Sequence, residues 1–144
     1  REVCRYRYET VEREHAFDVV RFELKDFRPV RPDGKWSLEG VERVPYRLPQ
    51  MIEAIGQGKS VVLVEGEKDV DNAAKIGLTA TTFPGGCGKW RDEYLPWFKG
   101  AIVVCVPDND IPGKKGMGLI ASRIATVARK AVWLNCPDFR RKAT

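Results

Sequence analysis

Residues 60–69 read Ser-Val-Val-Leu-Val-Glu-Gly-Glu-Lys-Asp, an apolar run that ends abruptly in glycine and charge. A run of this kind is typical of a parallel strand that is covered on both faces. The next residues favour a helix, because Val70, Ala73 and Ala74 fall on one helical face and Gly77 can adopt the left-handed conformation that ends a helix. The stretch therefore predicts a buried strand that turns directly into a helix.

A second unit of the same design follows. Residues 101–106 form another apolar run, residues 107–110 read Pro-Asp-Asn-Asp, and an amphipathic helix is predicted from about 114 to 129. Two further predicted strands, at 79–83 and 131–134, complete the pattern. Strands that alternate with helices predict an α/β fold with a mostly parallel four-stranded sheet flanked by helices. The remaining predicted elements are a short helix at 49–55 and a helix at 90–98 that Pro96 breaks or kinks.

The first 48 residues have a different pattern, because apolar and polar residues alternate as they do in strands with one solvent-facing side. The expected elements are strands at 4–9, 20–24 and 27–30, a loop at 13–15, a turn at 32–35 and a returning segment at 36–38. A small meander is not stable alone and must pack on another unit. We therefore divide the chain into an N-terminal antiparallel β extension over residues 1–48 and an α/β domain over residues 49–144.

The composition fits a folded protein of one ordinary domain's size, with 144 residues, 43% hydrophobic and 31% charged. There is no apolar run long enough to span a bilayer and no signal-peptide pattern, so we expect a cytoplasmic protein without a membrane partner. The formal net charge of +5 suits a polyanionic partner. His15 is the only histidine and no two cysteines are closely spaced, which argues against a zinc ribbon within the chain.

Four acidic residues follow the two buried strands: Glu65, Asp69, Asp108 and Asp110. The carboxyl ends of strands in an open α/β sheet are where ligands bind, so these side chains are expected to meet at one edge. A cluster of carboxylates is retained readily when a divalent cation neutralises it, and oxygen ligands favour Mg²⁺ or Mn²⁺. Asp69 has another interpretation, because an acid in a first helical turn also complements the helix dipole.

Other charged residues have alternative interpretations. Glu67 and Asp71 are expected to form the solvated side of a first helical turn. Arg28, Arg31 and Lys35, interleaved with Trp36, could contact nucleic acid through phosphate binding and base stacking. The favoured alternative for that segment is a solvated hairpin with a half-buried indole.

The residues Glu65-Gly66-x-x-Asp69, followed by Asp108-x-Asp110 and Gly113-Lys114, resemble the Toprim domain. This domain is shared by bacterial primases, type IA and type II topoisomerases and some nucleases. The chain is most similar to the primase-like proteins of phages, plasmids and integrated elements. The resemblance covers about residues 48–137, and the segment before it also resembles its counterpart in those proteins. It implies a Toprim, Rossmann-like sheet and a metal-dependent nucleotidyl-transfer domain of a DNA primase-like replication protein.

The resemblance also implies roles for single residues. Glu65 would act as general acid or base or as a metal ligand, Asp108 and Asp110 would form the metal-binding pair, and Asp69 would be a further acid near the metals. Gly66 and Gly113 would mark places where a side chain crowds the site. The basic residues implied near the nucleotide or template are Lys68, Lys114 and Lys115.

The glycine-rich segment Pro84-Gly-Gly-Cys-Gly-Lys89 resembles the loop that follows the second Toprim strand. Its backbone around Gly86 could approach a phosphate, with Lys89 and Arg91 adding positive charge. The alternative is a tight turn without a ligand, and the two interpretations are equally balanced. The glycine spacing does not match a P-loop.

Several points depart from the family or remain open. Asn109 stands where a glycine is frequent, and Asp138 is the only acidic residue after the last predicted strand, which suggests a fragment of a longer protein. The implied partners are single-stranded DNA template and nucleotides, with a helicase or zinc-ribbon domain in a full-length protein. Alternative functions are a Toprim nuclease, a topoisomerase-type cleavage module, or a non-catalytic module that docks nucleic acid or protein.

Overall fold

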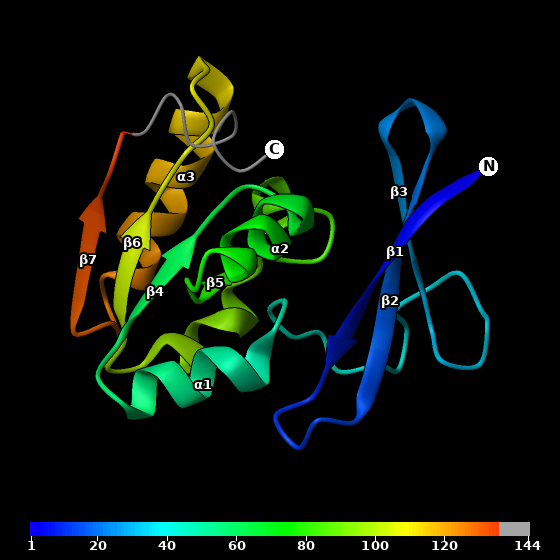
Figure 1. Cartoon of the computed structure of the whole chain (residues 1–144), viewed down its shortest axis with the longest axis horizontal. Coiled ribbons are helices and arrows are strands. Elements are labelled where there is room, and N and C mark those ends of the chain that lie inside the picture. The colour runs from blue at the N-terminus through cyan, green and yellow to red at the C-terminus, as the bar shows by residue number, and fades with distance from the viewer. Residues whose placement is uncertain (136–144) are drawn as a thin grey trace.

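A three-stranded antiparallel sheet and a four-stranded parallel sheet lie side by side in the computed structural model, which describes residues 1–135 (Figure 1). The antiparallel sheet has the order β1-β2-β3 and the parallel sheet the order β5-β4-β6-β7. The strands are β1 Glu2–Glu9, β2 His15–Phe22, β3 Asp26–Val30, β4 Ser60–Leu63, β5 Ala80–Thr81, β6 Ile102–Cys105 and β7 Lys130–Trp133. The α/β fold with an N-terminal antiparallel β extension, expected from the sequence, is confirmed.

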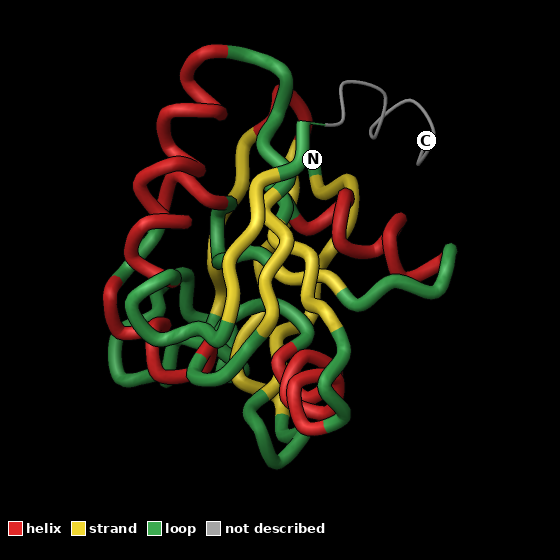
Figure 2. Tube along the Cα trace, turned by 90° about the vertical axis from the view of Figure 1, so that its left-hand side faces the viewer, coloured by secondary structure: helices red, strands yellow, loops and turns green. Residues whose placement is uncertain are grey.

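The α-helices within residues 1–135 are α1 Leu48–Gly56, α2 Glu67–Lys75 and α3 Ile111–Ile124. Helix α2 connects β4 to β5 and α3 connects β6 to β7, in opposite directions along the sheet. Right-handed crossovers in opposite directions place the two helices on opposite faces (Figure 2). Gly77, with φ of 83°, ends α2 as expected. No helix within residues 1–135 is long and apolar enough to cross a membrane.

One hydrophobic cluster runs through both sheets, with Tyr8 and Phe17 from the antiparallel sheet and Val61 and Leu63 from the parallel one. The ring of Tyr8 stacks on Phe17 at 4.6 Å between centroids and meets Tyr46 at 4.9 Å. Aromatic contacts of this kind add to the gain from burial. The antiparallel sheet therefore packs firmly on the rest of the molecule.

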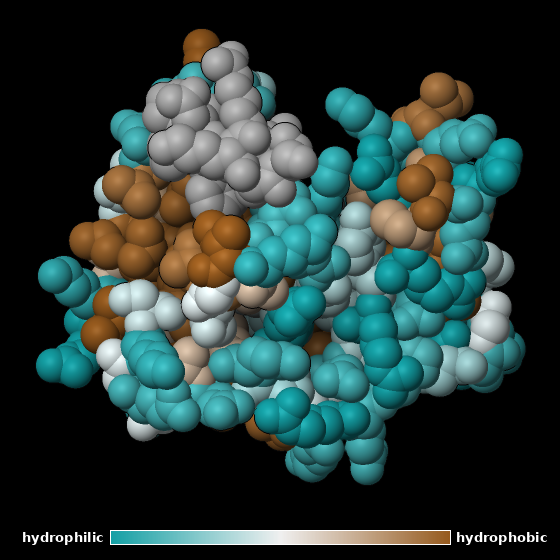
Figure 3. Space-filling model, in the orientation of Figure 1, coloured by the Kyte–Doolittle hydropathy of each residue, from teal (hydrophilic) through white to brown (hydrophobic). Residues whose placement is uncertain are grey.

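Strand β7 is an edge strand of the parallel sheet. Val132, Trp133 and Leu134 are each more than a third exposed there. Figure 3 shows apolar side chains gathered over this side of the molecule, in contrast to the largely hydrophilic remainder of the visible face.

Three details of the antiparallel sheet differ from expectation. Strand β2 begins at His15, predicted as a loop residue, and its residues 16–20 are buried throughout instead of alternating. The strand ends at Phe22 because Leu24 and Lys25 have φ of 66° and 59°, which an extended strand does not accommodate. The turn at 32–35 is present, but residues 36–38 form no strand, since the Ser37 N–H bonds back to the Lys35 carbonyl.

Two predicted helices also differ. Helix α3 begins at Ile111, ahead of the expected residue 114, because the Asp110 side chain caps it, and it ends at Ile124. Residues Asp92–Phe98 form a 3₁₀ helix that contains Pro96. Proline lacks the N–H that an α-helix interior needs, so the tighter turn replaces the expected kinked α-helix.

Candidate functional site at the carboxyl edge of the parallel sheet

Glu65 and Asp108 meet at the carboxyl edge because β4 and β6 are parallel neighbours, with Leu63 opposite Cys105. The Asp108 backbone N–H donates a hydrogen bond of 3.4 Å to Oε1 of Glu65. Both side chains are half-buried and line one hollow of about 270 Å³. The expected meeting of the two strand ends is thus present.

Gly113, in the first turn of α3, is the point on which these acids converge. A Cβ built on Gly113 would lie 2.7 Å from Oδ1 of Asp110, 3.0 Å from Cβ of Asp108 and 3.3 Å from Oε1 of Glu65. Contacts this short leave no room for a side chain at residue 113. The structure therefore places three of the four predicted acids around one glycine.

Asp110 also has a purely structural task. Its Oδ1 accepts a 2.6 Å hydrogen bond from the Gly113 N–H and so caps α3. Asp69 lies apart from this group, in the first turn of α2. It is buried and lines a neighbouring hollow of about 340 Å³ together with Arg21 and Lys25.

The donor set fits a hard cation, because carboxylate oxygens are the ligands that Mg²⁺ and Mn²⁺ prefer. Glu65 and Asp108 are the side chains that could serve, while one oxygen of Asp110 is occupied by the helix cap. Within residues 1–135 no group of three or more histidine, cysteine, aspartate or glutamate side chains is arranged to hold a metal ion. Asp138 and Cys136 lie outside the described residues.

The glycine-rich loop packs directly on the backbone of Glu65. Gly86 has φ of 88°, and a Cβ there would lie 2.8 Å from the Glu65 carbonyl oxygen. The Cys87 N–H donates to the same oxygen at 3.0 Å. Gly66, in contrast, has an extended φ of −148° and no atom within 4 Å of a built Cβ, so the structure gives no steric reason for glycine there.

Glu67 is not the solvated residue that the sequence suggested. It is only 3% exposed, and the Tyr8 hydroxyl donates to its Oε2 at 2.9 Å. Burial raises the pKa of the Glu67 carboxyl, opposed by hydrogen bonds to the carboxylate. The expectation was wrong for this residue because β1, distant in sequence, packs on the start of α2. Asp71 is partly exposed, accepts from the Tyr46 hydroxyl at 2.9 Å and pairs with Arg47 at 3.2 Å.

Two of the basic residues predicted as possible nucleic-acid contacts, Arg28 and Arg31, form ion pairs with acidic residues close by in sequence. Arg28 pairs with Asp26 at 3.0 Å, and Arg31 with Asp33 at 2.8 Å. Trp36 is 54% exposed and leans on Phe22, as a half-buried indole would. Arg91 pairs with Glu93.

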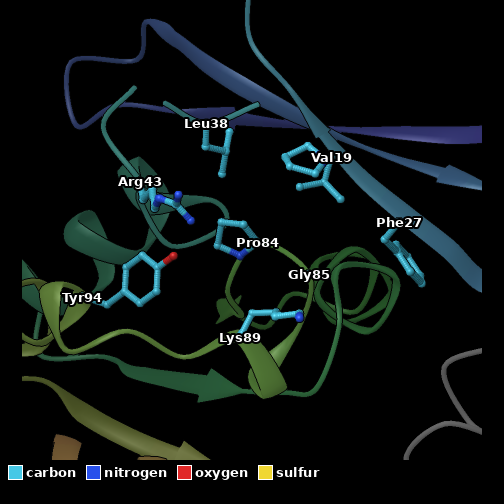
Figure 4. A pocket seen from close by; sticks show the side chains of 9 residues that line it. Val19, Phe27, Leu38, Arg43, Pro84, Gly85, Lys89 and Tyr94 are labelled. Atoms are coloured by element: carbon cyan, nitrogen blue, oxygen red, sulfur yellow. The ribbon is translucent and has the colours of Figure 1, made fainter. Parts of the chain in front are cut away.

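The lysines are more open. Each is exposed and, among residues 1–135, has no carboxylate within 4.0 Å: Lys35, Lys68, Lys89, Lys114 and Lys115. Lys89 also lines a cavity of about 170 Å³ between the antiparallel sheet and the glycine-rich loop. Figure 4 shows Arg43 and the Tyr94 hydroxyl directed toward this cavity. The cavity shares Phe27 and Gly85 with the hollow of Glu65, so the antiparallel sheet forms one wall of the site.

The fold and the site define a class of protein: a small antiparallel sheet joined to a parallel sheet with acidic residues at its carboxyl edge. Two solved structures that are similar to this fold come from DNA primases. A DNA primase domain from Pseudomonas aeruginosa superposes with a TM-score of 0.66 at 17% identity, covering 92% of this chain and 43% of that one. The primase fragment of the bacteriophage T7 primase-helicase protein gives 0.59 at 19% identity, covering 89% and 52%.

The chain therefore spans about half, or less, of each of these two structures. No protein-family model and no curated protein sequence matches it. At identities this low, the two superpositions establish a shared fold alone. This fold is the one that the Toprim resemblance implied.

Proposed function

We propose that this chain is the metal-dependent nucleotidyl-transfer domain of a DNA primase-like replication protein. It binds Mg²⁺ or Mn²⁺, nucleotides and a single-stranded DNA template. The primase fold supports this proposal, and one observation carries it: Glu65, Asp108 and Asp110 converge on Gly113, where a Cβ would clash. A side chain at this residue would meet a carboxylate oxygen of Asp110, one of Glu65 and the Cβ of Asp108.

Glu65 and Asp108 are the proposed metal ligands, and Asp110 contributes charge beside them while it caps α3. A divalent ion bound there would neutralise charge on the transferring phosphoryl group and favour ionisation of the attacking hydroxyl. The Asp108 N–H donates to Oε1 of Glu65, and this contact orients the carboxylate beside the other strand end. Asp69 faces the adjacent hollow and adds negative charge to the opening.

Phosphates are held by the basic residues around this edge. Lys68, Lys114 and Lys115 begin the two helices that flank the acids, and Lys89 lies on the glycine-rich loop. Because these lysines have no carboxylate partners among residues 1–135, their charge is open to a ligand. Arg28, Arg31 and Lys35 extend the positive surface along β3 and its turn, toward the template.

Calorimetric titration with Mn²⁺ tests the metal site. The wild type should bind, whereas Glu65→Gln and Asp108→Asn should weaken binding about tenfold or more. Glu53→Gln is a matched control, because Glu53 is an exposed acid on α1 that pairs with Arg13. Binding that is unchanged in Glu65→Gln or Asp108→Asn, in variants that melt like the wild type, would contradict the proposal.

Primer synthesis on single-stranded DNA then tests the reaction, in this chain and in a chain extended past Thr144. Synthesis that requires Glu65 and Asp108 supports nucleotidyl transfer. Loss of the DNA itself would instead identify a nuclease. Nucleic-acid binding that Asp108→Asn leaves unchanged, with no product in either chain, would identify a docking module.

A further inference from the structure

A buried carboxylate connects the antiparallel sheet to the strand-end acid. Glu67 begins α2 two residues after Glu65, yet it points inward and is 3% exposed. Its Oε2 accepts from the hydroxyl of Tyr8, a β1 residue with no exposed surface. Glu67 and Gly85 line the same hollow, and the backbone N–H groups of Gly85 and of Glu67 itself favour the ionised carboxylate and so lower its pKa. Groups from β1, the glycine-rich loop and α2 thus surround one side chain.

The glycine-rich loop also contacts the backbone of Glu65. The Cys87 N–H donates to the Glu65 carbonyl at 3.0 Å, and the Cys87 thiol donates to the Val64 carbonyl at 3.2 Å. Gly86 lies so close that a Cβ would meet the Glu65 carbonyl oxygen at 2.8 Å. Neighbouring groups therefore connect the two acids: Tyr8 bonds to Glu67, Glu67 lines one hollow with Gly85, and the loop that contains Gly85 packs on the Glu65 backbone.

We infer that Glu67 is a positioning residue, which fixes the glycine-rich loop and through it Glu65, and that Tyr8 makes this position depend on the docking of the antiparallel sheet. The contacts stand by themselves, and only the importance of Glu65 rests on the proposed function. Tyr8 is itself held by Phe17 and Tyr46, so displacement of the antiparallel sheet would remove the donor from Glu67. The antiparallel sheet, which carries the proposed template contacts, is thereby coupled to Glu65 at the carboxyl edge of the parallel sheet.

A direct ligand role for Glu67 explains these contacts less well. Its carboxylate accepts from the Tyr8 hydroxyl, the backbone N–H groups of Gly85 and Glu67 also favour its ionised form, and the residue is only 3% exposed. Buried charges persist when they are satisfied in this way. The carboxylates of Glu65 and Asp108, in contrast, line the open hollow.

Tyr8→Phe tests the inference without changing any carboxylate. Tyr46→Phe is the matched control, because it removes a hydroxyl that donates to Asp71, also on α2, at the same 2.9 Å. Amide hydrogen exchange should accelerate about fivefold or more at Gly85 and Cys87 in Tyr8→Phe but not in Tyr46→Phe. The side-chain carboxyl ¹³C shift of Glu65, at fixed pH and without metal, should move only in Tyr8→Phe. Glu67→Gln, which keeps the shape and one acceptor oxygen, should show a smaller change than Glu67→Ala.

Each outcome decides the inference. Unchanged exchange at Cys87 in Tyr8→Phe and Glu67→Ala would overturn it, whether or not the protein binds metal. Faster exchange with an unmoved Glu65 carboxyl shift would overturn the positioning role and leave only a loop anchor. Failure of the wild type to bind Mn²⁺ would count against the proposed function alone, since neither NMR measurement needs the metal.

Discussion

The backbone N–H of Asp108 donates to Oε1 of Glu65 across 3.4 Å, which joins the ends of two parallel strands that are neighbours in the sheet. This contact uses the backbone N–H of Asp108 to orient the carboxylate of Glu65. Because α3 begins directly behind it, the geometry of the acids depends on the first turn of that helix. The following predictions test this arrangement and the packing beneath it.

Gly113→Ala should disturb the acids directly. The new Cβ would lie 3.0 Å from Cβ of Asp108, which cannot yield without backbone movement. We expect a loss of about 1–3 kcal/mol in the free energy of unfolding, measured with urea, and weaker Mn²⁺ binding. Gly116→Ala is the control in the same helix: no atom lies within 4 Å, and the change should stabilise α3 by about 0.5–1 kcal/mol. Equal effects of the two variants would contradict the prediction.

Gly86→Ala should cost more stability than Gly34→Ala, because Gly86 combines φ of 88° and ψ of −180°, a backbone region nearly exclusive to glycine, with a close contact. Both glycines have φ near 90°, but only Gly86 faces an atom, the Glu65 carbonyl oxygen at 2.8 Å. Gly34→Ala should cost about 1 kcal/mol from the unfavourable φ alone. Gly86→Ala should cost at least about 1 kcal/mol more, because a backbone atom must move. Similar unfolding midpoints for the two variants would show that the loop does not pack on Glu65.

Two substitutions of Asp110 should separate its role as the cap of α3 from its negative charge beside the metal site. Asp110→Ala removes the acceptor for the Gly113 N–H and should lower stability by about 1 kcal/mol. Asp110→Asn retains the cap, because asparagine is an equally good N-cap residue, yet it removes the negative charge. Thermal melting should therefore distinguish Ala from Asn, whereas Mn²⁺ titration should show weakening in both. A stable Asp110→Ala protein would argue that the cap contributes nothing.

The buried cysteines should resist alkylation in the native protein. Burial raises the pKa of Cys105 to about 11 and raises that of Cys87 as well, so both thiols stay protonated near neutral pH. With iodoacetamide at pH 8, peptide mapping should show Cys4, which is partly exposed, reacting about 100-fold faster than either. Because the Cys105 pKa is raised, its contribution to stability is complete below pH 9 and is lost as the pH rises through about 11. Comparable native rates would contradict the buried placement, and full reaction in guanidinium is the control.

Residue types along the chain predicted the strands of the parallel sheet and the order in which helices connect them. The apolar runs at 61–64 and 101–106 indicate buried strands, and the helices between the strands favour a parallel sheet. The sequence also located Glu65 and Asp108, because a residue directly after such a strand emerges at the carboxyl edge. Even the helix end at Gly77 was readable, since it needs a positive φ. These features are local, so local residue types suffice to encode them.

The surroundings of those acids depend on packing between segments that are distant in sequence. Glu67 and Asp71 read as a solvated helical turn, yet Tyr8 and Tyr46 reach them from segments far away in the chain. Gly66 and Gly86 look alike in sequence, but only Gly86 faces the Glu65 carbonyl. The physical reason is that burial and hydrogen bonding are properties of pairs of segments, and the pairing is set by how the antiparallel sheet packs on the parallel one.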